Sequence, residues 1–150
     1  MNSQNENMGR NDILEIGTFF GYSAINMAKK MSSTSKLVTI EASEENANVA
    51  KIIITRCFSK YHPDIMSRIQ ILTGKSSDIL LNESLRISLP HFSFVYLDHD
   101  KDSYLPDLKT LEQLNMLDPI HCTVVADNVG MHHFLIFNHT NLMFNIIHQL

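Results

Sequence analysis

Five short apolar runs alternate along the chain with segments whose apolar residues recur at helical spacing. The runs predict strands at 13–17, 37–41, 69–73, 92–97 and 122–126. The intervening segments predict helices at about 23–31, from Ser43 onward, from Ser76 or Ser77 to about 85, and at 105–114. Such alternation is typical of a parallel sheet with helices on its faces. Right-handed crossovers then bring the carboxyl ends of all these strands to one edge of the sheet.

The helix after the second run has the clearest starting signals. Ser43 is a good N-cap, and the two acidic residues that follow place negative charge in the first turn, where the helix dipole favours it. Apolar positions then recur three and four residues apart, which predicts one buried face. This face is formed by Ala47, Ala50, Ile54, Cys57 and Phe58.

The chain divides into three parts. Residues 1–11 are a polar N-terminal extension, residues 12–129 form the α/β domain, and residues 130–150 form a tail without Asp, Glu, Lys or Arg. The pattern assigns the tail no definite element. Because the fifth strand would otherwise be an open edge, we expect part of 134–147 to pack against it, or the chain to associate with itself through it.

Composition and charge exclude several classes of protein. A net charge of −4 offers no basic surface for phosphate backbones, so no nucleic-acid partner is expected. No apolar run is long enough to span a membrane, and no membrane partner is expected. Cys57 and Cys122 lie in apolar segments without metal-ligand spacing, which predicts buried reduced thiols and a cytoplasmic protein.

Glycine or acidic residues mark the ends of four of the five expected strands, at the edge where such sheets bind ligands. Gly17 and Gly21 let the backbone of the first turn approach a ligand closely. Their G-x-x-x-G spacing differs from the G-x-G-x-x-G that binds a pyrophosphate, which favours a nucleoside ligand without that bridge. Glu41, 20 residues after Gly21, suits ribose hydroxyls. A tight turn followed by a solvated glutamate explains these residues equally well.

Two later acidic residues predict a metal site. If the fourth and fifth strands are neighbours, Asp98 and Asp127 lie roughly 5 Å apart, and Asn128 adds a neutral oxygen. Two carboxylates and an amide, with open positions for water and substrate, suit octahedral Mg²⁺. An ordinary turn after the fifth strand gives the same Asp-Asn pair. Lys101, three residues after Asp98, is a candidate base beside such a cation, or a surface lysine in a charged loop.

Longer strings of residues extend this interpretation. They are ILEIGTFFGYSA at 13–24, VTIE at 38–41, GKSSD at 74–78, YLDHDKDSYLPD at 96–107 and ADNV at 126–129. Together they resemble the catechol O-methyltransferase family of class I S-adenosylmethionine-dependent methyltransferases over about residues 12–129. The last two strings in combination are the specific ones, whereas the glycine motif alone is not.

The resemblance implies a Rossmann-like doubly wound α/β sheet of about five parallel strands in the order 3-2-1-4-5. It also implies magnesium-dependent transfer of a methyl group from S-adenosylmethionine to one hydroxyl of a catechol, with small-molecule substrates of the catecholamine type. The implied cofactor-binding residues hold the methionine part, the ribose and the adenine, and are Glu15, Gly17, Tyr22, Ser23, Glu41, Ser77, Asp98 and His99. The implied metal ligands are Asp98, Asp127 and Asn128, and the implied general base is Lys101.

Three departures from the family pattern leave alternatives open. The family has helices before the first strand and a strand pair after the fifth, and we recognise neither here. Asp100 stands where the family typically has a tryptophan. We therefore expect a chain shortened at both ends, without the final strand pair. One alternative is a truncated S-adenosylmethionine-binding fragment with weak or no catalysis. Another is a nicotinamide-dependent oxidoreductase, which the missing pyrophosphate motif disfavours.

Overall fold

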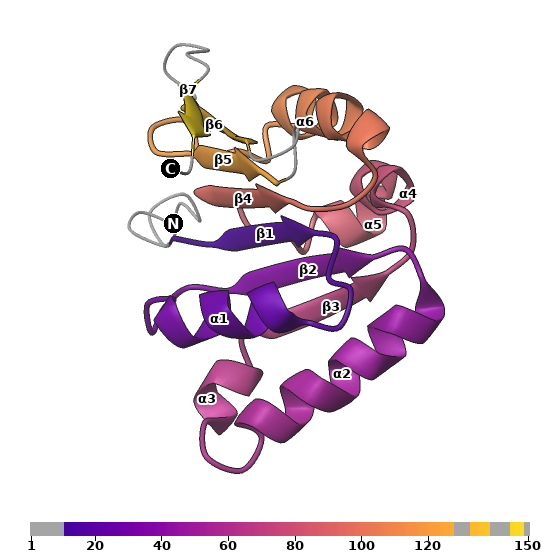
Figure 1. Cartoon of the computed structure of the whole chain (residues 1–150), viewed down its shortest axis with the longest axis vertical. Coiled ribbons are helices and arrows are strands. Elements are labelled where there is room, and N and C mark those ends of the chain that lie inside the picture. The colour runs from indigo at the N-terminus through magenta and orange to yellow at the C-terminus, as the bar shows by residue number, and fades with distance from the viewer. Residues whose placement is uncertain (1–10, 128–132, 139–144, 149–150) are drawn as a thin grey trace.

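The computed structural model of the chain describes residues 11–127, 133–138 and 145–148. The predicted extension at 1–11, and with it the expected lack of helices before the first strand, falls almost entirely outside these residues. A single seven-stranded sheet runs through the molecule, with helices between the parallel strands (Figure 1). The strands are β1 (Ile13–Ile16), β2 (Leu37–Glu41), β3 (Ile69–Thr73), β4 (Phe94–Leu97), β5 (Thr123–Ala126), β6 (His133–Asn138) and β7 (Asn145–His148). The helices are α1 (Tyr22–Lys30), α2 (Glu44–Phe58), α3 (Pro63–Met66), α4 (Ser76–Leu81), α5 (Glu83–Arg86), the 3₁₀ helix η1 (Lys101–Ser103) and α6 (Tyr104–Gln113).

The strand order in space is β3-β2-β1-β4-β5-β6-β7. β1 lies parallel between β2 and β4, with Ile13 opposite Leu37 on one side and Phe94 on the other. β3 and β5 extend the parallel sheet at its two sides. The predicted order 3-2-1-4-5 is therefore confirmed. The order reverses between β1 and β4, and ligands of such sheets bind in the crevice outside the carboxyl ends of the strands at this point.

The expectation that the sheet lacks a final strand pair is wrong. β6 pairs antiparallel with β5, with Thr123 opposite Asn138, and β7 pairs antiparallel with β6. The tail therefore covers the edge of β5, as one of the two expectations for 134–147 requires. A short continuous apolar run such as 134–137 fits a strand and a buried helix equally well, so the pattern alone does not assign it. Association of two chains remains a separate prediction.

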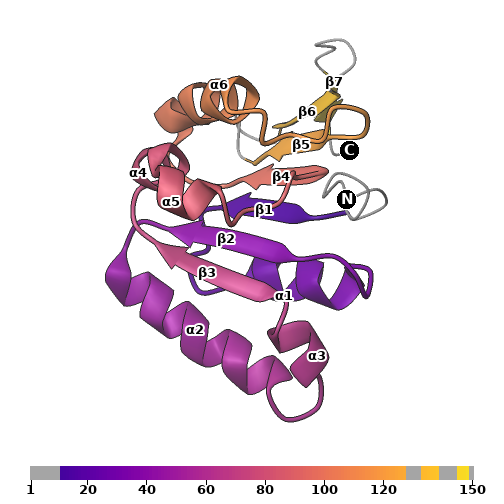
Figure 2. The ribbon, with the colours of Figure 1, turned by 180° about the vertical axis from the view of Figure 1, so that it is seen from behind.

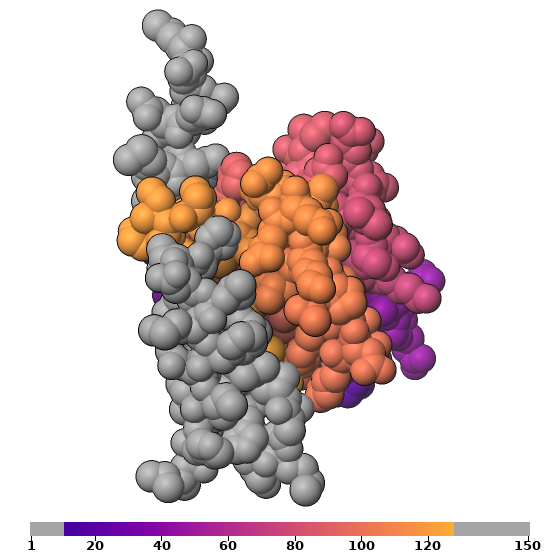
Figure 3. Space-filling view, turned by 90° about the horizontal axis from the view of Figure 1, so that it is seen from above, coloured from indigo at the N-terminus to yellow at the C-terminus, as the bar shows by residue number. Residues whose placement is uncertain are grey.

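Helices cover the two faces of the sheet with separate apolar cores (Figures 1 and 2). On one face, residues of α1 and α2 pack together with Leu37 of β2; those of α1 are Ala24 and Ala28, and those of α2 are Ala50, Ile54 and Phe58. On the other face, residues of α4 and α6 pack against β1, β4 and β5; they are Ile79, Leu80, Leu108 and Leu111. Seen from above, α6 lies at the outer surface beside the α4–α5 region (Figure 3). No helix among the described residues is long and apolar enough to cross a membrane.

Two helices differ in detail from the prediction. Ser43 caps α2 as expected, since its side chain accepts a hydrogen bond from the Asn46 amide at 3.3 Å. The prediction that Cys57 is buried is wrong: its position lies about 100° around the helix from Phe58, at the border of the apolar stripe, and it is exposed. The helix predicted from Ser76 or Ser77 to about 85 is two short helices, because Asn82 ends α4 and caps α5.

Candidate functional site

The turn after β1 passes so close to the end of β4 that only glycine fits there. Gly17 has φ +103°, and a Cβ on it would lie 2.2 Å from the Asp98 carbonyl oxygen. Gly21 has φ +85° and forms the N-cap of α1. A Cβ at this position would meet the Ile54 side chain of α2. A left-handed conformation of this kind favours glycine. The predicted close approach at Gly17 is therefore an approach to Asp98, which brings the first turn and the fourth strand to one place.

Glu15 lies beneath this turn rather than in a cavity. Its side chain is fully buried and accepts hydrogen bonds from the Ser23 hydroxyl and from Thr39 Oγ1, the latter at 2.5 Å. Thr39 is in turn hydrogen-bonded to Thr18. Burial raises the pKa of Glu15 to about 7, although the two hydrogen bonds oppose the shift. Glu15 therefore links the first turn to β2 through Thr39 and to α1 through Ser23.

Glu41 ends β2 and organises the same turn from the other side. Its Oε2 accepts a hydrogen bond from the Phe19 amide at 2.8 Å, and its Oε1 accepts one from the Ser43 amide at 2.9 Å. Phe19 has φ +48°, an uncommon conformation for a bulky residue. A carboxylate has about four acceptor positions, so these two bonds leave capacity for ligand hydroxyls. Glu41 thus meets the requirement for the predicted ribose acceptor.

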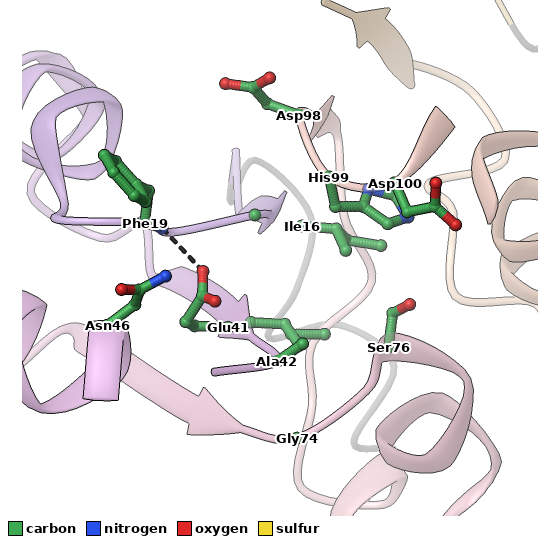
Figure 4. A pocket seen from close by; sticks show the side chains of 12 residues that line it. Ile16, Phe19, Glu41, Ala42, Asn46, Gly74, Ser76, Asp98, His99 and Asp100 are labelled. Atoms are coloured by element: carbon green, nitrogen blue, oxygen red, sulfur yellow. Dashed lines mark hydrogen bonds between the residues drawn. The ribbon is translucent and has the colours of Figure 1, made fainter. Parts of the chain in front are cut away.

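The first pocket is a cavity of about 430 Å³ at the carboxyl ends of β1, β2 and β4. One part of its wall is the turn at Gly17 and Phe19, together with Glu41 and with Asn46 of α2. The rest comes from the segments that follow β3 and β4, which contribute Gly74, Ser76, His99 and Asp100. Figure 4 shows Glu41 beside Phe19 on one side, with His99 and Ser76 across the pocket. The Asp98 carboxylate points away from this group (Figure 4).

A buried carboxylate of α6 connects two walls of the first pocket. Asp107 Oδ2 accepts a hydrogen bond from Ser76 Oγ at 2.5 Å and lies 2.8 Å from His99 Nε2. The His99 ring packs 5.0 Å from that of Tyr104. Its Nδ1 is buried and has no hydrogen-bond partner among the described residues. Buried polar atoms are almost always hydrogen-bonded, so this ring nitrogen is an exception beside the first pocket.

The second pocket adjoins the first and shares Gly17, Phe19 and Asp98 with it. It has a volume of about 550 Å³ and lies between α1 and the neighbouring strands β4 and β5. Its walls are mostly aromatic or apolar, and the contributing side chains are Phe20, Tyr22, Met27, Phe94, Tyr96 and Val125. The predicted residues Tyr22 and Ser23 line this second pocket and not the first. The first pocket is the more polar of the two, and it opens beside one that is largely apolar.

Asp98 and Asp127 come together at this second pocket. Leu97 and Ala126 are opposite each other in the β4–β5 register, so the two aspartates follow neighbouring strand ends, and both line the cavity. Tyr96 donates its phenolic hydrogen bond to Asp127 Oδ2 at 2.7 Å. Burial and this bond raise the Tyr96 pKa far above its usual range. Asn128, the predicted third ligand, lies outside the described residues.

The donor set fits a hard cation in its chemistry. Within the described part of the chain no group of three or more His, Cys, Asp or Glu side chains is placed to hold a metal ion. Two carboxylates on adjacent strand ends, with an amide as the next residue in sequence, are nevertheless the oxygen ligands that Mg²⁺ takes when it keeps several waters. Asp98 and Asp127, which both line the second pocket, would hold such an ion.

Three predicted residues lie apart from the cavities. Lys101 begins η1, is exposed, and places its ammonium group 5.6 Å from the centre of the Tyr104 ring. Ser77 is exposed too, and its neighbour Ser76 lines the first pocket in its place. Glu15 is buried beneath the first turn and lines neither pocket. Lys101 and Ser77 line neither pocket.

Sequence reasoning missed four residues that shape the site. Phe19 stands between two glycines, and Ser76 is one residue from the predicted Ser77. Asp107 ends the YLPD string, where an acidic residue in the first turn of a helix has an ordinary explanation. Tyr96 is part of an apolar strand. The one signal for its role was the alternation of side chains along β4, which places Tyr96 on the same face of the sheet as Phe94.

Comparisons with known proteins agree with this geometry. The family model described as O-methyltransferase matches residues 6–135. Catechol O-methyltransferase of Sus scrofa is 32% identical over 117 residues, which cover 78% of this chain and 59% of that protein. A crystal structure of an O-methyltransferase from Bacillus cereus in complex with SAH has 28% identity and a TM-score of 0.65, covering 84% of this chain and 56% of that one. The O-methyltransferase TomG from Streptomyces achromogenes, in complex with SAM, has 28% identity and a TM-score of 0.63, covering 77% and 48%.

The chain therefore belongs to the O-methyltransferase family, with a Rossmann-like sheet of the class I methyltransferase type. Its resemblance to the catechol O-methyltransferases is confirmed. It spans 59% of the Sus scrofa relative and 48% of the Bos taurus one, about half the length of such proteins.

Proposed function

We propose that this chain carries the S-adenosylmethionine-dependent methyl-transfer site of a magnesium-dependent O-methyltransferase that acts on a catechol hydroxyl, with catecholamine-type substrates. The observation that carries the proposal is the pair of adjoining pockets, which share Gly17, Phe19 and Asp98. The first pocket is the more polar of the two and contains Glu41, Ser76 and His99, and the second has the largely apolar walls that an aromatic acceptor needs. Methyl transfer requires the two reactants to be held in contact, and adjoining cavities with a common wall provide that positioning.

The first pocket is the proposed site of the nucleoside half of the cofactor. Glu41 accepts hydrogen bonds from the ribose hydroxyls, while His99 lies at the adenine end of the same pocket. Gly17 lies at the wall shared with the second pocket, where the methionine part passes to Tyr22 and Ser23. The bound cofactor supplies an electrophilic methyl group on a sulfonium. The relatives solved with SAM and SAH support this assignment by the similarity of their fold.

The second pocket is the proposed site of the acceptor. Phe94, Tyr96 and Val125 form a wall against which an aromatic ring can pack. Asp98 and Asp127, with Asn128 after them, are the proposed ligands of Mg²⁺. A bound divalent cation acidifies and orients a hydroxyl. The similarity to catechol O-methyltransferase of Sus scrofa supports the catechol as the acceptor.

Lys101 is the proposed general base, and its placement favours a second candidate. Its ammonium group lies over the Tyr104 ring and lines neither pocket, so removal of an acceptor proton requires the side chain to turn inward. This observation favours a chain that binds the cofactor but catalyses weakly or not at all. The family match supports methyl transfer over the nicotinamide alternative.

Transfer of labelled methyl from S-adenosylmethionine to a simple catechol tests the proposal. We expect product with Mg²⁺, little without it, and loss of product in Asp127→Ala and Lys101→Ala. Lys109→Ala, an exposed lysine of α6, is the matched control for the second variant. Absence of product from a chain that still binds S-adenosylhomocysteine would favour the weakly catalytic alternative. Product that does not depend on Mg²⁺ would refute the metal site.

A further inference from the structure

Tyr96 brings a hydroxyl group into a cavity wall that is otherwise apolar on its β4 side. Residues two apart in a strand face the same side of the sheet, so Tyr96 and Phe94 point together into the second pocket. The Tyr96 ring packs there beside Val125, its partner on β5. Its hydroxyl, however, is directed along the strand to the Asp127 carboxylate, 2.7 Å away. A phenylalanine would form the same wall, so the hydroxyl has a separate role.

Hydrogen bonds within the described residues reach Asp127 at its amide, at its carbonyl and at one carboxylate oxygen. Its amide donates to the Leu97 carbonyl at 2.8 Å, and its own carbonyl accepts from the Tyr104 hydroxyl at 3.0 Å. These two bonds fix the main chain at the end of β5. The bond from Tyr96 fixes Oδ2, and with it the rotation of the side chain. Loss of the Tyr96 hydroxyl therefore keeps both backbone bonds and removes one restraint on the carboxylate.

We propose that Tyr96 is a positioning residue for Asp127: its phenol holds the carboxylate in the orientation in which Asp127 and Asp98 face a divalent cation together. The inference rests on the magnesium site of the proposed function and adds the group that builds it. A phenol donates one hydrogen bond, and a carboxylate can accept about four, so the bond orients Asp127 without using up its oxygen lone pairs. Partners that orient a ligating carboxylate typically change metal affinity 10- to 100-fold when removed.

Titration of the 150-residue chain with Mn²⁺ alone tests this role. Binding is measured as the decrease of the electron paramagnetic resonance signal of the free ion. We expect Tyr96→Phe to bind Mn²⁺ about 10-fold more weakly than the wild type. Its affinity for S-adenosylhomocysteine should stay unchanged. Tyr61→Phe, which removes the hydroxyl of an exposed tyrosine far from the cavity, is the matched control and should bind like the wild type.

Three results would contradict parts of this picture in distinguishable ways. If the wild type binds Mn²⁺ and Tyr96→Phe binds it equally well, Tyr96 does not position Asp127, while the proposed metal site stands. If Tyr96→Phe loses Mn²⁺ and S-adenosylhomocysteine affinity in parallel, the residue is merely structural and the inference fails. If the wild type binds no Mn²⁺, the metal site itself fails, and the role of Tyr96 fails with it.

Discussion

Replacing Glu15 by Gln should flatten the dependence of stability on pH. Glu15 is fully buried beneath the first turn, and among the described residues its carboxylate has hydroxyl donors, Ser23 and Thr39, but no cationic partner. Burial disfavours the charged form, and the nearby carboxylates of Asp98 and Glu41 add to this effect. Gln has the same size and keeps one acceptor for the hydroxyls, so it removes the charge without emptying the site.

The magnitude follows from the shift in the Glu15 pKa, from 4.5 to about 7. Between these values the unfolded chain releases the proton while the folded chain keeps it, so stability falls as pH rises through this window. Below pH 4.5 both states hold the proton, and above about pH 7 both have lost it. At 1.36 kcal/mol per pKa unit, the loss attributable to Glu15 is about 3 kcal/mol.

Urea denaturation at a series of pH values measures this contribution. The other titrating groups are common to both proteins, so they cancel in the difference between the wild type and Glu15→Gln. That difference should move by about 3 kcal/mol in favour of the variant between pH 4.5 and 7.5. Glu45→Gln, at an exposed position of α2, should show no such trend. Parallel curves for the wild type and Glu15→Gln would show that burial does not raise the Glu15 pKa.

Two further substitutions test the walls of the first pocket. Gly17→Ala places a Cβ 2.2 Å from the Asp98 carbonyl, so the turn must move away from β4; melting temperature should fall and calorimetric binding of S-adenosylhomocysteine should disappear. Retained binding would refute the close approach at this position. Asp107→Asn weakens the bonds to Ser76 and His99, and we expect S-adenosylhomocysteine affinity to fall about 10-fold, as for loss of a charge-assisted hydrogen bond. An unchanged dissociation constant would mean that Asp107 does not organise that wall.

The parallel sheet was predictable because its signals are local. β2 and β3 coincide with the apolar runs 37–41 and 69–73, and Ser43 caps α2 as its residue type indicates. Right-handed crossovers then leave few orders for the strands. The tail has no comparable signal, since its apolar run at 134–137 becomes a strand only through pairing with β5. Pairing between strands is a contact that the periodicity of one segment does not report.

The site was predictable in outline for a similar reason. Strand ends fix where Gly17, Glu41, Asp98 and Asp127 lie, whatever the connecting loops do. Side chains in the connections are a different case, because their direction depends on packing. Ser76 rather than Ser77 faces the first pocket, since successive helical residues point in different directions. Likewise, Lys101 is exposed because it begins the helix η1, and its spacing to Asp98 in the sequence does not report this direction.

Calorimetric titration of S-adenosylhomocysteine into the 150-residue chain tests the central claim most directly, because every proposed step requires a nucleoside between Gly17 and Glu41. Saturable binding is expected, with an affinity at least 10-fold weaker in Glu41→Gln, which loses a charged acceptor, and unchanged in Glu45→Gln. NAD⁺ should neither bind nor compete. Absence of binding by the wild type, or displacement of S-adenosylhomocysteine by NAD⁺, would contradict the assignment of this pocket.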